Sequence, residues 1–179
     1  MVADPNDPRW DDSETPVRVV HPHPVTRAPR NLPPLPDDAP EWYVHARMET
    51  GIKEMPGAAF HPRIMEYFKA TTLGTSVQND ETAWCSAFAC WCMERSGIAS
   101  PHRANARSWL NWGEKLTTPR FGCIVVFWRG SPQSAQGHVG FYVSETASTV
   151  NVLGGNQGNQ VCVAPYPKMR VLGYRWTKE

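Results

Sequence analysis

The chain has 179 residues, of which 41% are hydrophobic and 20% charged, and its formal net charge is +1. This size and composition fit one compact domain with a tail. We expect neither a membrane span nor a Sec-type signal peptide, because no run approaches the roughly 18 to 20 apolar residues that cross a bilayer and the first twenty residues carry five acidic side chains. A charge near zero also argues against non-specific nucleic-acid binding, which requires a strongly basic face.

The first forty residues differ in composition from the remainder of the chain. They hold ten of the seventeen prolines, and their four arginines and seven acidic residues give a net charge of −3, which leaves +4 for residues 41–179. Proline removes backbone donors and stops helices. We therefore predict an extended or disordered segment over residues 1–40 and a folded, mildly basic domain over residues 41–179.

Helical patterns come first in the domain. Apolar residues spaced four apart predict a helix over about residues 41–52. A second short helix should begin at Pro62, since proline is favoured in the first helical turn. Residues 83–96 are apolar on almost every face, which is typical of a central helix packed on several sides. Residues 103–112 are predicted as a further helix.

The pattern changes to strands after residue 119. Short β-branched or aromatic runs are separated by Gly, Ser, Asn or Pro, which indicates strands joined by turns. The runs are residues 123–128, 138–144, 149–153, 160–164 and 170–176. Connections this short favour antiparallel pairing. The predicted fold class is α+β, with helices packed on an antiparallel sheet of about five strands.

Cys85 lies near the start of the predicted central helix, with Thr82 as a candidate N-cap. Unpaired backbone N–H groups and the positive end of the helix dipole stabilise a thiolate there, and they can also receive an oxyanion. Taken alone, a cysteine on an apolar helix is more often a packing residue. That second interpretation applies to Cys90 and Cys92, which lie further along the same helix. We expect no metal site, because the spacing of Cys90 and Cys92 does not fit zinc.

A histidine between two glycines stands at the start of a predicted strand, in the sequence GHVG at 137–140. His138 is therefore a candidate base for activating a thiol, although a hydrogen-bonded strand residue would give the same local pattern. The next strand ends in LGGNQ at 153–157, which places Asn156 and Gln157 beside the start of the histidine strand. An amide oxygen from either residue can fix the imidazole tautomer. The residues alone leave the choice between Asn156 and Gln157 for this third position open.

Several segments together resemble a bacterial and phage-associated group of NlpC-like and CHAP-like cysteine peptidases. They are GIKEMPG at 51–57, WCSAF at 84–88, ARSWLNWG at 106–113, GHVGFYV at 137–143, LGGNQ at 153–157 and VLGYRW at 171–176. The resemblance implies a papain-like catalytic domain over residues 41–179 that cleaves amide bonds in peptidoglycan peptides without a cofactor. By this resemblance Cys85 is the nucleophile, His138 the general base and then acid, and Asn156 the orienting residue. One position departs from the group, where Cys123 replaces the usual aspartate after glycine.

The resemblance also suggests which side chains line a substrate cleft: Glu54, Trp84, Arg107, Trp109 and Trp112. For the tryptophans, core packing is the competing interpretation. Without a Sec signal, an enzyme made in the cytoplasm needs another route to the periplasm or wall of a target bacterium, such as type VI secretion or phage lysis. A secretion-apparatus component and an immunity protein would then be expected partners. The alternative functions are a catalytically silent wall-binding or phage-tail module and a cysteine peptidase that acts on protein.

Overall fold

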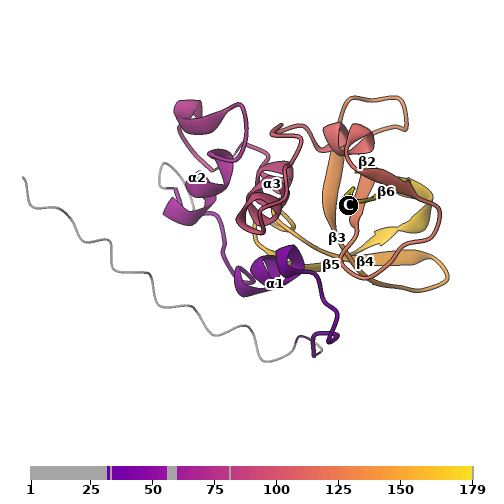
Figure 1. The fold of residues 1–179 in the computed structure, drawn as a ribbon. Coiled ribbons are helices and arrows are strands. Elements are labelled where there is room, and N and C mark those ends of the chain that lie inside the picture. Colours follow the sequence, from indigo (N-terminus) through magenta and orange to yellow (C-terminus); the bar gives the residue numbers. More distant parts are fainter. Residues whose placement is uncertain (1–31, 33, 56–59, 81, 179) are drawn as a thin grey trace, which may run out of the picture.

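The structure is a computed structural model that describes residues 32, 34–55, 60–80 and 82–178. Most of the predicted proline-rich segment 1–40 lies outside the described residues, so that boundary stays a prediction. Three α-helices precede a six-stranded sheet, which confirms the α+β class. Figure 1 shows the helices on one side of the domain and the strands on the other, with α3 nearest the sheet. No helix among the described residues is long and apolar enough to cross a bilayer.

The helices follow the predicted order with shorter bounds. They are α1 (Glu41–Met48), α2 (Pro62–Phe68) and α3 (Cys85–Arg95). Helix α1 ends four residues earlier than predicted, and the chain then turns through Gly51, whose φ of 95° favours glycine. The helix predicted over 103–112 is instead a 3₁₀-helix, η2 (Ala106–Asn111), in which the Asn105 side chain accepts a hydrogen bond from the Arg107 backbone N–H.

The antiparallel sheet has the strand order β1-β6-β2-β3-β4-β5. Its strands are β1 (Glu114–Leu116), β2 (Ile124–Trp128), β3 (Gly137–Glu145), β4 (Thr149–Gly154), β5 (Cys162–Pro167) and β6 (Val171–Trp176). Strand β1 was not predicted, and β5 begins two residues later than expected. The sheet is not a simple meander, because β6 returns to pair with β2 and β1. Antiparallel pairing throughout agrees with the prediction from connection length.

The core lies between α3 and the sheet. Eight of the eleven residues of α3 are buried, as the apolar pattern predicted. Two polar contacts join α2 to the end of α1. The Tyr67 hydroxyl donates to the Glu49 carboxylate at 2.6 Å, and Arg63 Nε lies 3.1 Å from the same carboxylate oxygen. These contacts join α1 and α2, the two helices that pack against α3.

Candidate active site

Cys85 is the first residue of α3 and is only 5% exposed. The N-cap is Trp84, and no side chain caps the helix, so the prediction that Thr82 serves as N-cap is wrong. The first-turn N–H groups are therefore not taken up by a side-chain cap. Burial raises the pKa of the Cys85 thiol, while backbone N–H groups of Val139 and Ser86 and the charge of Arg129 act in the opposite direction.

His138 is the second residue of β3 and is fully buried. It pairs with Phe127 of β2, and its ring stacks on Tyr166 of β5 with centroids 4.8 Å apart and planes 19° apart. Burial lowers the pKa of His138 to about 4, with the hydrogen bond to Gln157 raising it and the Arg129 charge lowering it further. The imidazole is therefore neutral at pH 7.

Gln157 supplies the amide that contacts the histidine. Its Oε1 lies 3.0 Å from His138 Nε2, and its Nε2 donates to the backbone carbonyls of Val152 and Cys162. Because both amide hydrogens are used by carbonyls, Oε1 is the acceptor and His138 carries its proton on Nε2. Asn156, the residue predicted for this position, makes no described hydrogen bond to His138 and turns the chain with a φ of 56°.

Arg129 approaches the other ring nitrogen. Its Nη2 lies 3.3 Å from His138 Nδ1. A guanidinium can only donate, so Nδ1 is the acceptor, in agreement with the proton on Nε2. The two sides of the ring thus specify one tautomer of the neutral imidazole, with Nδ1 unprotonated.

The structure brings Cys85 and His138 to one place. The thiol is influenced by the N–H of Val139, which directly follows His138, and both side chains are influenced by the charge of Arg129. Sequence reasoning missed Arg129 and Tyr166. Arg129 directly follows β2, whose last residues pair with the start of β3, so strand pairing alone could have placed it beside His138.

Four of the five predicted cleft residues have other roles. Trp84 and Trp109 are fully buried, which favours the core-packing interpretation. Their indole N–H groups donate to Glu54 at 2.7 Å and to Ser86 at 2.9 Å. The Arg107 guanidinium donates to backbone carbonyls of the segment 131–136. Glu54 is half-buried and remains a candidate cleft residue.

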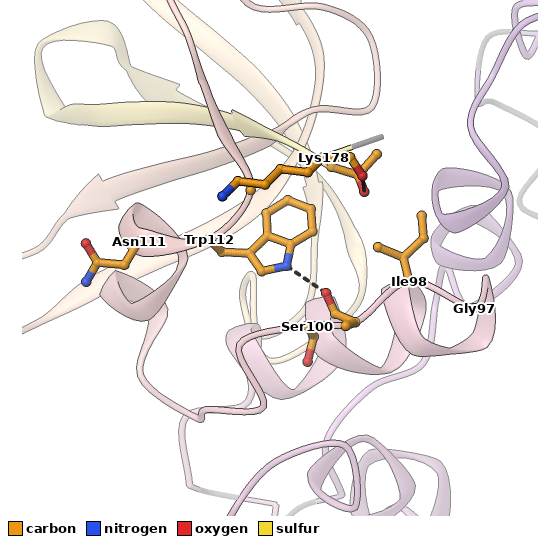
Figure 2. A pocket seen from close by; sticks show the side chains of 9 residues that line it. Gly97, Ile98, Ser100, Asn111, Trp112 and Lys178 are labelled. Atoms are coloured by element: carbon orange, nitrogen blue, oxygen red, sulfur yellow. Dashed lines mark hydrogen bonds between the residues drawn. The ribbon is translucent and has the colours of Figure 1, made fainter.

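Trp112 lies in a separate hollow, shown in Figure 2. Its indole N–H donates to the Ala99 carbonyl at 2.7 Å, and residues 97–100, 111–113 and 177–178 line the hollow. Neither Cys85 nor His138 belongs to this lining. Trp112 is therefore not placed with the residues of the candidate active site.

All five cysteines are free thiols in the structure. Within the described part of the chain, no three His, Cys, Asp or Glu side chains gather as the ligands of a metal ion would. The chemistry that these residues support is that of a thiol beside an imidazole, with a glutamine amide orienting the imidazole.

Comparison with known proteins shows which family the chain is similar to. The family model of the CHAP domain matches residues 77–156, which confirms the resemblance to the CHAP-like group. The match spans Cys85, Arg129 and His138 and ends at Asn156. No curated protein matches this chain.

Among solved structures, the chain is similar to a Staphylococcus aureus subsp. aureus Mu50 protein described as similar to a lipoprotein of the NLP/P60 family. The sequence identity is 12% and the TM-score 0.45, over 84% of this chain. The match spans 45% of that protein, which is less than half of its length.

Proposed function

We propose that this chain is a peptidoglycan hydrolase that cleaves an amide bond of the wall peptide by thiol chemistry. Cys85 is the nucleophile, His138 the general base and then acid, and Gln157 the residue that orients the imidazole. The observation that carries the proposal is the bond between His138 Nε2 and Gln157 Oε1, which directs the unprotonated Nδ1 away from the amide. The CHAP-domain match over residues 77–156 supports the substrate class.

The reaction begins with proton transfer from the Cys85 thiol to His138 Nδ1. The sulfur attacks the carbonyl carbon of the peptide, and N–H groups at the start of α3 stabilise the oxyanion. The imidazolium then gives its proton to the leaving nitrogen as the C–N bond breaks, which leaves a thioester on Cys85. Water, activated by His138, hydrolyses the thioester and restores the thiol.

The resting state of the site is the neutral pair. Burial raises the pKa of the Cys85 thiol and lowers that of His138 to about 4, so both effects disfavour a preformed thiolate–imidazolium pair. Deprotonation of the thiol is therefore coupled to substrate binding or to the attack itself. The site is nearly closed to solvent, with Cys85 5% exposed, so substrate and the hydrolytic water reach the sulfur only when the site opens.

The site of action in this proposal is the periplasm or wall of a bacterium. We also propose that the protein reaches this site by type VI secretion or by phage lysis. If it is an injected enzyme, we expect an immunity protein that covers the Cys85 site. Both points rest on the sequence alone.

The test is to incubate the protein with purified sacculi and to weigh the released fragments by mass spectrometry. The wild-type protein should release peptide fragments, and Cys85→Ala and His138→Ala should release none. Cys90→Ala is the matched control, because it makes the same substitution on the same helix at a thiol that lies near Ser100 and the Arg103 carbonyl rather than beside His138. Equal products from wild type and Cys85→Ala, or none from either, would show that the chain is not this enzyme.

A further inference from the structure

Arg129 is an exposed residue whose backbone is held in a turn after β2. Its N–H donates to the Gln136 carbonyl at 3.2 Å, and its carbonyl accepts from the Ser134 hydroxyl at 2.5 Å. This turn directs the guanidinium to His138, with Nη2 3.3 Å from Nδ1. The contact thus depends on the geometry of the segment 129–136.

Arg107 holds the same segment from the side of η2. Its Nε donates to the Gln136 carbonyl at 3.0 Å and its Nη1 to the Pro132 carbonyl at 3.1 Å. Close packing supports this arrangement, because a Cβ at Gly137 would lie 3.2 Å from Arg107 Cγ and 2.9 Å from the Phe127 carbonyl. The backbone of Arg129 is therefore fixed, and its guanidinium contacts the Tyr166 side chain as well as His138.

The contact occupies the nitrogen that the reaction needs. Nε2 of His138 is engaged by Gln157, so only Nδ1 can accept the Cys85 proton, and in the substrate-free protein Nδ1 already accepts from Arg129. Proton transfer therefore requires Arg129 to move off the ring. The other groups that face this imidazole are Phe127 and Tyr166, whose side chain also hydrogen-bonds Arg129, and neither carries a carboxylate that would compete for the guanidinium.

Arg129 forms no ion pair with any carboxylate of the described residues. The ion pairs described involve other cations, such as Arg63 with Glu49 and Lys168 with Glu145. An exposed guanidinium beside a reaction centre, without an acidic partner from its own chain in the described part, is suited to bind a carboxylate of a ligand through paired N–H groups.

We propose that Arg129 is a specificity-determining residue, whose guanidinium leaves His138 for a carboxylate of the bound peptide and thereby frees Nδ1 for the Cys85 proton. This inference rests on the proposed function, because it names the kind of wall peptide that the same site accepts. The substrate class is a peptide with a free carboxylate close to the scissile amide. Such a substrate contributes twice, since the carboxylate binds Arg129 and the departure of Arg129 from the ring activates the base.

The first experiment compares two synthetic wall peptides that differ only in a carboxylate or a carboxamide beside the scissile bond. The wild type should cleave the carboxylate peptide with a kcat/KM roughly tenfold to hundredfold higher, the range expected for a hydrogen-bonded charged group. Arg129→Met should reduce this ratio to about one, and Arg129→Lys should keep part of it. Arg103→Met is the matched control, since Arg103 is also exposed and its side chain makes no described contact. Retention of the full ratio in Arg129→Met would overturn the inference.

The second experiment does not depend on turnover. Binding of the two peptides to Cys85→Ala should favour the carboxylate by a similar factor, and Cys85→Ala/Arg129→Met should bind both equally. In the substrate-free protein, ¹⁵N spectra should show Nδ1 of His138 unprotonated, and its pKa of about 4 should rise in Arg129→Met while burial keeps it below the ordinary 6.5. An unchanged His138 pKa, or equal binding of both peptides to Cys85→Ala, would refute the inference even if hydrolysis is observed. A carboxylate preference in binding without any hydrolysis would refute the proposed function alone.

Discussion

Oε1 of Gln157 lies 3.0 Å from Nε2 of His138, at the end of the strand that pairs with the histidine strand. The Gln157 amide is itself fixed by the carbonyls of Val152 and Cys162, so it cannot rotate to present its NH₂ group to the ring without losing both bonds. The Gln157 amide therefore has a fixed orientation, and it fixes the orientation of the His138 ring. A general base needs such a fixed orientation.

The first prediction concerns the neighbours Gln157 and Asn156. Gln157→Ala should lower kcat about 10²-fold with a smaller effect on KM, because the imidazole loses its orienting acceptor. Asn156→Gly is the control, since glycine retains the left-handed backbone at φ 56° and removes only the amide. Steady-state kinetics on a wall peptide measure both variants. A larger loss in Asn156→Gly than in Gln157→Ala would return the orienting role to Asn156.

The second prediction is a pH dependence of stability. The folded pKa of His138 is about 4, below its ordinary value of 6.5, so between these values the unfolded chain binds the additional proton. Stability from this residue is complete above about pH 6.5 and decreases as the pH falls toward 4. The expected contribution to the loss is about 2 to 3 kcal/mol at pH 4.5.

Urea unfolding of wild type and His138→Gln at pH 7 and pH 4.5 measures this contribution. Glutamine does not titrate, so the variant should lose less free energy of unfolding between the two pH values than the wild type. Equal losses in the two proteins would mean that His138 is not buried as a neutral imidazole.

The third prediction concerns the Arg107 contacts to the segment 131–136. Arg107→Met should lower the free energy of unfolding by about 1 to 2 kcal/mol, because the carbonyls of Pro132 and Gln136 lose a charged donor. Amide hydrogen exchange should accelerate in this segment before it does in β3. Arg103→Met, an exposed arginine without a described side-chain contact, should change neither measurement. Unchanged exchange in Arg107→Met would show that Arg107 does not fix the segment.

The fourth prediction concerns the glycine beside the central helix. A Cβ at Gly155 would lie 2.5 Å from the Trp84 ring and 2.8 Å from Phe88 Cβ. Gly155→Ala should therefore lower the free energy of unfolding by about 1 to 3 kcal/mol through overpacking, and it should shift the loop that carries Gln157. Gly158→Ala is the comparison, since a Cβ there meets open space and its cost is only that of a φ of 60°. In thermal and urea unfolding, Gly155→Ala should be less stable than Gly158→Ala. A lower stability of Gly158→Ala would contradict the close packing of Gly155 against Trp84 and Phe88.

The three α-helices, the strands β2 to β6 and the positions of Cys85 and His138 were predictable because each depends on a local pattern. The run of apolar residues around Cys85 required a buried helix, and the glycines around His138 marked the start of a strand. The 3₁₀ form of residues 106–111 was not predictable in the same way, because an Asn105 cap and tertiary packing, rather than periodicity, define it.

The choice between Asn156 and Gln157 depended on the tertiary structure. Strand alternation specifies which side chain faces inward only while the backbone stays extended. After Gly154 the chain leaves the strand, and at Asn156 it adopts a φ of 56°, so alternation no longer decides the direction of the next side chain. Gln157 faces His138 because the carbonyls of Val152 and Cys162 hold its amide there.

By itself, the sequence determined the fold class, the placement of Cys85 at a helix start and the placement of His138 at a strand start. The tertiary structure decided that Trp84 and Trp109 are core residues, because their indole N–H groups find partners in Glu54 and Ser86 inside the domain. It also brought Arg129 to the histidine. Contacts between residues far apart in the chain depend on strand pairing and on the partners that each polar atom finds, and a local pattern does not contain that information.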